Sequence, residues 1–363
     1  MIADRMKYID ASGIRKVFDL AKKMKNPINL SIGQPDFDVP EEIKSEAIQA
    51  IQKGYNKYTP TQGIDSLRTQ LLQKIKAERG FEAEDILITS GVSGGILLSF
   101  MTLLNPGDEV IIPDPYFVMY KHLSRLLGAV PIYLDTYPDF IVTAESLKEK
   151  ISSRTKLIIL NSPANPTGAV IPSGELRAIA RVCESFGITI LSDEIYSSFC
   201  YDEPFDSVAR YYPKTLILDG FSKSHAMTGW RMGYAAGSSE IIQAMTKLQQ
   251  FSFVCAPSFA QYAALKALSL DLTGHTDLYR KKRDLIYQGL SQKFEVQKPS
   301  GAFYIFPKAP NDNADEFSKK AMENNLLIIS GSVFSEKNTH FRISYAASEE
   351  TLLEGLEILN QIS

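Results

Sequence analysis

Between residues 86 and 218 the apolar positions alternate between two patterns. Short continuous apolar runs are each followed by a longer stretch with apolar residues three or four positions apart. The first pattern is typical of buried strands and the second of amphipathic helices. Strands are expected at 86–89, 109–112, 130–134, 156–160, 188–191 and 216–218. Strands that alternate with helices predict a mainly parallel sheet with helices on both faces.

Helical patterns flank this region on both sides. They predict helices at 1–26, 41–53, 64–79, 240–251, 258–269 and 276–292, with a short strand at 28–32. Past Pro299 the rhythm changes to strands at 303–306, 326–329 and 341–345 and helices at 314–324 and 349–361. This change predicts a separate, smaller α+β domain.

Polar motifs follow the predicted strands at their carboxyl ends. They are Ser90–Gly95, Asp114–Phe117, Asn161–Gly168, Ser192–Tyr196 and the turn Gly220–Lys223. In an open α/β sheet the ligand binds beyond the carboxyl ends of the strands. The sequence therefore predicts a single site at one edge of the sheet.

Lys223 is the most informative residue of that edge, because it stands just past a buried strand. Desolvation and nearby cations lower the pKa of a lysine and make its amine a nucleophile at neutral pH. Taken alone, a lysine in a Ser/Gly loop is more typical of a solvated surface.

Two other motifs are equally ambiguous when each is taken alone. Ser90–Gly94 opens a helix, where backbone N–H groups bind phosphate, but it is neither GxGxxG nor a P-loop, and such a turn is more often structural. Asp193 ends a buried strand and needs a cationic partner. Either a protonated ring nitrogen of a cofactor or a structural salt bridge satisfies that need.

Composition narrows the function classes. The chain has 363 residues, 44% hydrophobic and 22% charged, with a net charge of −3, which indicates a globular protein of two domains without a nucleic-acid partner. The apolar runs are too short for a membrane span, and the charged N-terminus lacks the apolar core of an export signal, so a cytoplasmic location is expected. The three cysteines and four histidines are scattered, and no metal site is expected.

The segment Gly220–Gly233 resembles the lysine signature of the class I and II aminotransferases, which use pyridoxal phosphate. Further segments resemble landmarks of that family in the same order: 32–37, 58–63, 161–168, 192–196, 299–304 and 341–344. The resemblance spans nearly the whole chain and is closest to the prokaryotic-type aspartate and aromatic aminotransferases of fold type I. It implies a large domain over residues 40–275, with a mainly parallel seven-stranded sheet flanked by helices. Residues 1–39 and 276–363 would form the small α+β domain.

The resemblance also implies a role for each site residue. Lys223 would form a Schiff base with pyridoxal 5'-phosphate and carry the proton during the reaction. The cofactor would further contact Val92, Ser93, Ser222 and Arg231 at its phosphate, Phe117 at its ring face, Asn165 and Tyr196 at its phenolic oxygen, and Asp193 at its ring nitrogen. Tyr58 would reach the phosphate from the neighbouring subunit of a homodimer. Arg342 would bind the substrate carboxylate, assisted by Asn165 and Gly33, and Ile14 and Tyr304 are further candidates to line the pocket.

The implied activity is transamination between an L-amino acid and a 2-oxo acid, with 2-oxoglutarate as the expected acceptor and aspartate or an aromatic amino acid as donor. A C–S lyase or synthase on the same fold is the alternative, since the same lysine serves both. A regulatory pyridoxal-phosphate-binding module is disfavoured, because the chain lacks the length and basic charge of a DNA-binding domain. Two departures weaken the inference about the donor. Phe117 stands where the best-known aspartate enzymes have tryptophan, and Gly94–Leu97 offers no charge to an acidic side chain. Arg15 is a candidate for that charge only by elimination.

Overall fold

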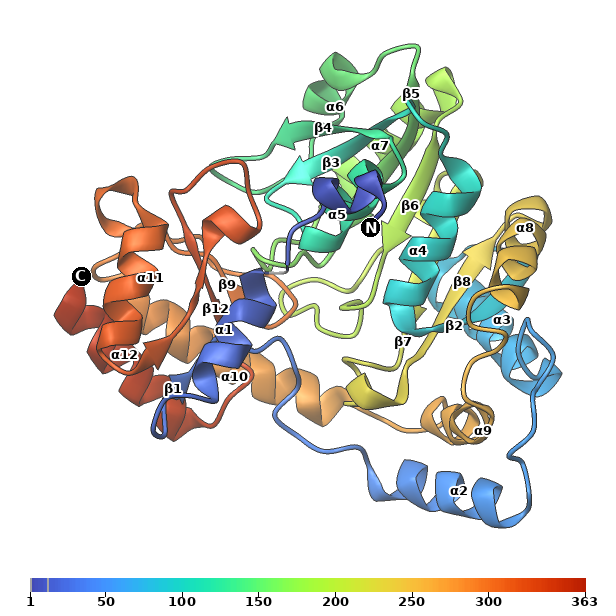
Figure 1. The fold of residues 1–363 in the computed structure, drawn as a ribbon, viewed down its shortest axis with the longest axis horizontal. Coiled ribbons are helices and arrows are strands. Elements are labelled where there is room, and N and C mark those ends of the chain that lie inside the picture. The colour runs from blue at the N-terminus through green and yellow to red at the C-terminus, as the bar shows by residue number, and fades with distance from the viewer. Residues whose placement is uncertain (1, 12) are drawn as a thin grey trace.

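A seven-stranded sheet forms the centre of the computed structural model, which describes residues 2–11 and 13–363 (Figure 1). The strand order is β2-β8-β7-β6-β5-β3-β4. Strands β3 to β7 run parallel, and only β8 pairs antiparallel, with both β2 and β7. The strands are β2 (Asp85–Ser90), β3 (Glu109–Asp114), β4 (Val130–Asp135), β5 (Thr155–Asn161), β6 (Thr189–Asp193), β7 (Thr215–Gly220) and β8 (Met232–Gly237). The prediction of a mainly parallel seven-stranded sheet is confirmed.

The apolar pattern did not locate strand β8. Its sequence, MGYAAG, is rich in glycine and alanine, which are depleted in strands. The small residues are needed here because a Cβ on Gly233 would lie 2.6 Å from the amide nitrogen of Val92. The strand is thus shaped by the close approach of the helix that follows β2, which a local pattern does not reveal.

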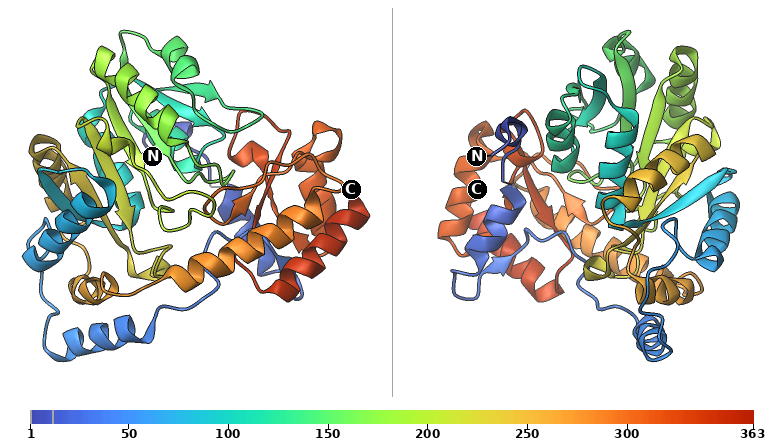
Figure 2. Two further views of the ribbon diagram at one scale, coloured as in Figure 1. Left: turned by 180° about the vertical axis from the view of Figure 1, so that it is seen from behind. Right: turned by 45° about the vertical axis from the view of Figure 1, so that its right-hand side comes forward.

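Helices cover both faces of this sheet, as the two views of Figure 2 show. Alternate strand residues supply the two cores, since successive side chains point to opposite faces. Leu216 and Leu218 pack on one side with α4 (Gly91–Leu103), α5 (Val118–Leu126) and α8 (Ser239–Gln250), while Ile217 packs on the other side. That other side is covered by α2 (Glu41–Gln52), α3 (Asp65–Arg79), α6 (Ala144–Lys150), α7 (Ser173–Phe186) and α9 (Ser258–Ala267).

Two smaller sheets lie beside the carboxyl edge of the large one. The first has the order β11-β12-β9, from β9 (Tyr304–Ile305), β11 (Ile329–Ser330) and β12 (Phe341–Ser344). The second pairs β1 (Ile28–Asn29) with β10 (Leu326–Leu327), so both ends of the chain contribute to this part. Its helices are α1 (Gly13–Ala21), α10 (Thr273–Leu290), α11 (Ala314–Glu323) and α12 (Glu349–Ile362). Figure 1 shows α1 beside the C-terminal strands.

The N-terminal prediction was partly wrong. Instead of one helix over 1–26, the chain forms a 3₁₀ turn at Asp4–Tyr8 and the separate helix α1, because the backbone is extended at Ile9. The strand expected at 28–32 is reduced to β1, after which the chain turns toward the large sheet. The boundaries at residues 40 and 275 stay a prediction.

Candidate active site

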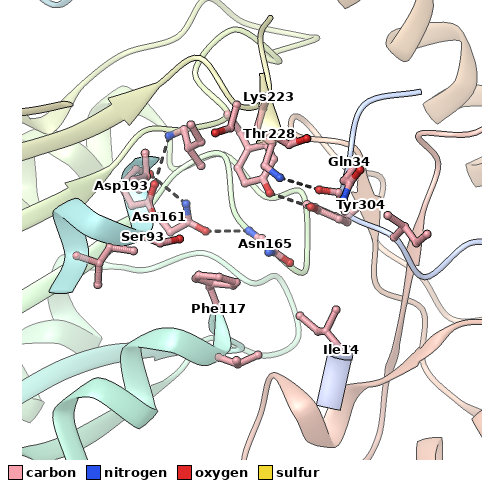
Figure 3. Close-up of a pocket in the computed structure, with 18 of the residues that line it drawn as sticks. Ile14, Gln34, Ser93, Phe117, Asn161, Asn165, Asp193, Lys223, Thr228 and Tyr304 are labelled. Atoms are coloured by element: carbon pink, nitrogen blue, oxygen red, sulfur yellow. Dashed lines mark hydrogen bonds between the residues drawn. The ribbon is translucent and has the colours of Figure 1, made fainter. Parts of the chain in front are cut away.

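A cavity of about 510 Å³ lies at the carboxyl edge of the large sheet, where the two parts of the chain face each other. Every predicted site residue except Tyr58 lines it: Gly33, Val92, Ser93, Phe117, Asn165, Asp193, Tyr196, Ser222, Lys223, Arg231 and Arg342. Ile14, Arg15 and Tyr304 line it as well. Figure 3 shows Lys223, Asp193, Asn165 and Phe117 around the opening, with Ile14 and Tyr304 contributed by the other part of the chain.

Lys223 stands on the turn that follows β7, and its side chain enters the cavity (Figure 3). Its Nζ donates a hydrogen bond to the carbonyl oxygen of Gly33 at 2.6 Å. Burial lowers the pKa of this amine to about 8, and the charges of Arg342 and Arg231 add to that effect while Asp193 opposes it. A considerable fraction of the amine is therefore neutral and nucleophilic near physiological pH.

Asp193 ends β6 and is almost completely buried. Its Oδ2 accepts a hydrogen bond from the Tyr120 hydroxyl at 2.6 Å, and its Oδ1 accepts one from the Ile195 amide at 3.3 Å. Burial raises the pKa of the carboxyl to about 6, although both hydrogen bonds favour the charged form. A cation bound above it would remove this desolvation penalty.

The partner of Asp193, Tyr120, was missed by the sequence analysis. It lies in α5 one helical turn after Phe117, and the two rings make an edge-to-face contact at 5.7 Å. A tyrosine three residues after a phenylalanine in an amphipathic helix reads as core, and this one is indeed only 1% exposed. The contact between its hydroxyl and Asp193 depends on how the strands are ordered in the sheet. The sequence around Tyr120 therefore did not indicate this contact.

The start of α4 forms a cradle for an anion. Ser90 precedes the helix and makes no side-chain capping hydrogen bond, and the Gly91 amide donates to the Arg231 carbonyl at 3.0 Å. The next amides at the helix start have no acceptor within the helix itself. Gly91 has φ = +64°, and a Cβ there would lie 2.6 Å from Nη2 of Arg231. Arg231 itself has φ = +57° and donates from Nη1 to the Thr228 carbonyl at 2.7 Å. A guanidinium is thereby held next to the start of α4, a combination that suits a phosphate group.

Arg342 stands on β12, and its side chain is among the largest fully buried ones of the protein. Nη1 donates to Oδ1 of Asn165 at 2.9 Å and Nη2 to the Ser31 carbonyl at 2.7 Å. The guanidinium lies 4.6 Å from the ring centroids of both Tyr304 and Phe334. Its Nε is buried without a hydrogen-bond partner, and burial lowers the pKa of the group. These features indicate a site for an anionic ligand, because a buried cation requires a counter-charge.

Tyr196 and Tyr304 join the two parts of the site through a hydrogen bond of 2.8 Å between their hydroxyl groups. Burial raises the pKa of both hydroxyls, so both stay protonated at neutral pH. Tyr58, in contrast, is 84% exposed and lies apart from the cavity of its own chain.

Comparison with known proteins is consistent along the whole chain. The sequence profile described as "Aminotransferase class I and II" matches residues 25–359. The chain belongs to the class I and II aminotransferase family. It is 40% identical to the "Probable aspartate aminotransferase" of Methanocaldococcus jannaschii, with 100% of both chains covered. It is 35% identical to "Aromatic-amino-acid aminotransferase 2" of Thermococcus litoralis, covering 99% of this chain and 98% of the relative.

Among solved structures, the aspartate aminotransferase from Thermus thermophilus with maleate superimposes with a TM-score of 0.96 at 34% identity, and 100% of both chains is covered. This neighbour confirms the predicted α/β aminotransferase fold. The family depends on pyridoxal phosphate. Nothing in the comparisons favours the alternative of a C–S lyase. In the part of the chain that the structure describes, no helix is long and apolar enough to cross a membrane.

The residues around the cavity fit pyridoxal phosphate as a group. The cradle at Gly91 and Arg231 suits its phosphate, and the buried carboxyl of Asp193 suits a protonated ring nitrogen. Phe117 offers an aromatic ring, and Lys223 an amine of lowered pKa. Arg342 also lines the cavity, and its guanidinium suits the carboxylate of a substrate.

Proposed function

We propose that this protein transfers the amino group of an L-amino acid to a 2-oxo acid, with pyridoxal phosphate bound in the cavity around Lys223. The observation that carries this proposal is the arrangement of Arg342. A buried guanidinium that is held by Asn165 and Ser31 shares one cavity with an amine of lowered pKa. Amino acids and 2-oxo acids both carry the carboxylate that such a guanidinium binds.

The cofactor would be held at four points. Arg231, Ser222 and the amides of Val92 and Ser93 would bind its phosphate. Phe117 would cover its ring, while Asp193 would pair with the ring nitrogen and Asn165 and Tyr196 would donate to the phenolic oxygen. When bound, pyridoxal phosphate supplies an electron sink for the bond broken at the substrate Cα.

Lys223 would act as the acid and base of the reaction. Its Nζ would take the proton from the substrate Cα and pass it to C4′ of the cofactor, which requires an amine that is neutral for part of the cycle. Burial and the charges of Arg342 and Arg231 favour that neutral form, with a pKa of about 8. The hydrogen bond to Gly33 keeps the amine inside the cavity.

Arg342 would fix the substrate through its carboxylate. The two aromatic rings and the bonds to Asn165 and Ser31 hold the plane of the guanidinium in one orientation. A held planar fork binds a carboxylate in one geometry. The Cα–H bond would then be presented to Lys223 in the same way for different side chains.

The donor and acceptor belong to this proposal as well. We propose aspartate or an aromatic amino acid as donor and 2-oxoglutarate as acceptor, in line with the names of the relatives. The lining of the cavity includes the apolar residues Ile14, Ile96 and Val118, which suit an aromatic group. Arg15 also lines the cavity and could meet an acidic side chain.

A homodimer would complete the site with Tyr58 of the second subunit. Exposed apolar side chains on and near α2 and after α8 support such an interface: Ile48, Ile51, Tyr55, Tyr58, Phe251, Phe253 and Val254. Phe253 lies close to Gly94, so this surface reaches the phosphate cradle. The cytoplasmic location stays a prediction.

Reduction of the loaded protein tests the proposal. Protein incubated with pyridoxal phosphate should turn yellow, and borohydride should fix the cofactor mass on the peptide that contains Lys223. The Lys223→Ala variant should carry no fixed cofactor. A wild-type protein that stays colourless at saturating pyridoxal phosphate would exclude the proposed cofactor site.

A further inference from the structure

A second cluster of charges lies directly behind the site, on the opposite face of the large sheet. It consists of Arg79, Glu194 and Asp219 and is called the Arg79 cluster below. Arg79 ends α3, and its side chain is only 4% exposed. Nε donates to Glu194 Oε2 at 2.9 Å, and Nη2 donates to Asp219 Oδ2. One guanidinium thus bridges two buried carboxylates, one directly after β6 and one in β7.

Both carboxylates adjoin residues of the active site in sequence. Glu194 directly follows Asp193, the last residue of β6. Asp193 lines the cavity, whereas Glu194 is bonded to Arg79 of α3. Asp219 lies at the end of β7, four residues before Lys223. Arg79 is therefore bonded to the two chain segments that carry the proposed ring-nitrogen partner and the proposed proton carrier.

Other hydrogen bonds also hold the two carboxylates in place. Glu194 accepts from Ser192 at 2.9 Å and from Ser207, and Asp219 accepts from Tyr234 at 3.1 Å and from the Gly220 amide. Ser197, in the turn after β6, bonds to both Arg79 and Asp219. Within the described residues Arg79 is the cation paired with these two carboxylates.

We propose that Arg79 is a positioning residue for the reaction, which sets the separation and orientation of Asp193 and Lys223 by holding Glu194 and Asp219 together from behind. This inference rests on the proposed function of those two residues. A merely structural role is the alternative. A structural role explains the cluster less well, because a buried ion pair often stabilises a fold no more than apolar residues of the same volume would.

Helix α3 provides a matched control for the stability that any lost ion pair removes. Arg68 lies on the same helix and also reaches the large sheet, donating to Asp85 at 2.7 Å and to the Ile86 carbonyl at 3.1 Å. These partners belong to β2 and are not bonded to the turns of Asp193 and Lys223. Arg68→Met therefore loses an ion pair to the sheet without loosening the proposed catalytic pair.

The experiment compares Arg79→Met, Arg79→Lys and Arg68→Met with the wild type, all loaded with pyridoxal phosphate. In Arg79→Met we expect kcat to fall about 10- to 100-fold, because small displacements of reacting groups are costly. The KM for the amino acid should change less than about threefold, since Arg342 is bonded to Asn165 and Ser31 and not to the cluster. The pH midpoint of the cofactor absorbance should move upward, because a buried positive charge is lost.

Arg79→Lys keeps the charge but cannot bridge both carboxylates as a planar fork. It is expected to keep the midpoint and to lose kcat, and it serves as the test variant if Arg79→Met does not fold. Arg68→Met should keep kcat and the midpoint. The inference is overturned if the Arg79 variants that fold match Arg68→Met in kcat and absorbance titration. A wild-type protein without transamination would instead refute the proposed function itself.

Discussion

The Lys223 amine donates a hydrogen bond to the carbonyl oxygen of Gly33 at 2.6 Å, although the two residues are 190 positions apart in sequence. Two residues earlier in the same segment, the Ser31 carbonyl accepts a hydrogen bond from Arg342. The segment after β1 thus contacts both the proposed proton carrier and the proposed carboxylate binder. It links the two parts of the chain at the place where a substrate would lie between them.

Arg342→Lys should impair substrate binding more than its retained charge suggests. Lysine lacks the planar fork and cannot keep both bonds to Asn165 and Ser31 while it binds a carboxylate. We expect kcat/KM for the amino acid to fall about 100-fold, with the cofactor still bound. Steady-state kinetics with Arg283→Lys as control measures this, since Arg283 is an equally buried arginine paired with Asp202 outside the cavity. Equal losses in both variants would refute a special role for Arg342.

Asp193→Asn should nearly abolish turnover while the site stays folded. The amide oxygen still accepts the Tyr120 hydroxyl, but the negative charge that would keep a ring nitrogen protonated is lost. We expect kcat to fall at least about 100-fold. Tyr120→Phe keeps the carboxylate and should lose no more than about tenfold. Rapid-quench or steady-state rates of the two variants decide, and a fully active Asp193→Asn protein would remove Asp193 from the mechanism.

Tyr58 provides a test of the shared site. Mixed dimers formed from Tyr58→Phe and Lys223→Ala subunits should be more active than either variant alone. One site of each mixed dimer would combine the Lys223 of one subunit with the Tyr58 of the other. Activity after co-refolding or co-expression, with each variant alone as control, measures this. If mixing gives only the average of the parents, Tyr58 does not act across the interface.

His225 should make the protein sensitive to acid. Its ring is buried behind the Lys223 turn, with Nε2 donating to the Ala267 carbonyl at 3.0 Å and Nδ1 accepting from Ser224 at 2.8 Å. Burial lowers its pKa to about 4. The pKa of His225 is lower in the folded protein than in the unfolded chain. The contribution of His225 to the free energy of unfolding is therefore fully present above pH 6.5 and is lost as the pH falls toward 4.

The difference between the folded and unfolded pKa of His225 predicts the size of the effect. Between pH 7.5 and 5 the wild type should lose about 2 kcal/mol more free energy of unfolding than His225→Gln. Denaturant unfolding at the two pH values measures it, and the comparison cancels the contributions of other groups. Equal losses in both proteins would mean that His225 titrates normally in the folded state.

The sequence predicted which residues line the cavity, because most of them follow strands. Lys223, Asp193 and Asn165 stand in motifs at strand ends, and strand order alone brings such ends together. Strand β8 was not predicted, because its glycines and alanines lack the apolar pattern of a strand. Gly233 is small because the start of α4 lies against it. Tyr120 and Phe334 were not predicted as site residues, because their polar partners, Asp193 and Arg342, are distant in sequence. Their local sequence pattern is that of ordinary core residues. Tyr58 stays a prediction, since its partner would belong to another chain.

The central claim is that Lys223, Asp193 and Arg342 together transfer an amino group. The most direct test mixes the cofactor-loaded protein with one L-amino acid at a time and no acceptor. Aspartate or an aromatic amino acid should change the cofactor spectrum and yield one 2-oxo acid per subunit, and added 2-oxoglutarate should restore the original spectrum. A spectrum that no amino acid changes, or release of ammonia with the 2-oxo acid and without an acceptor, would contradict the account.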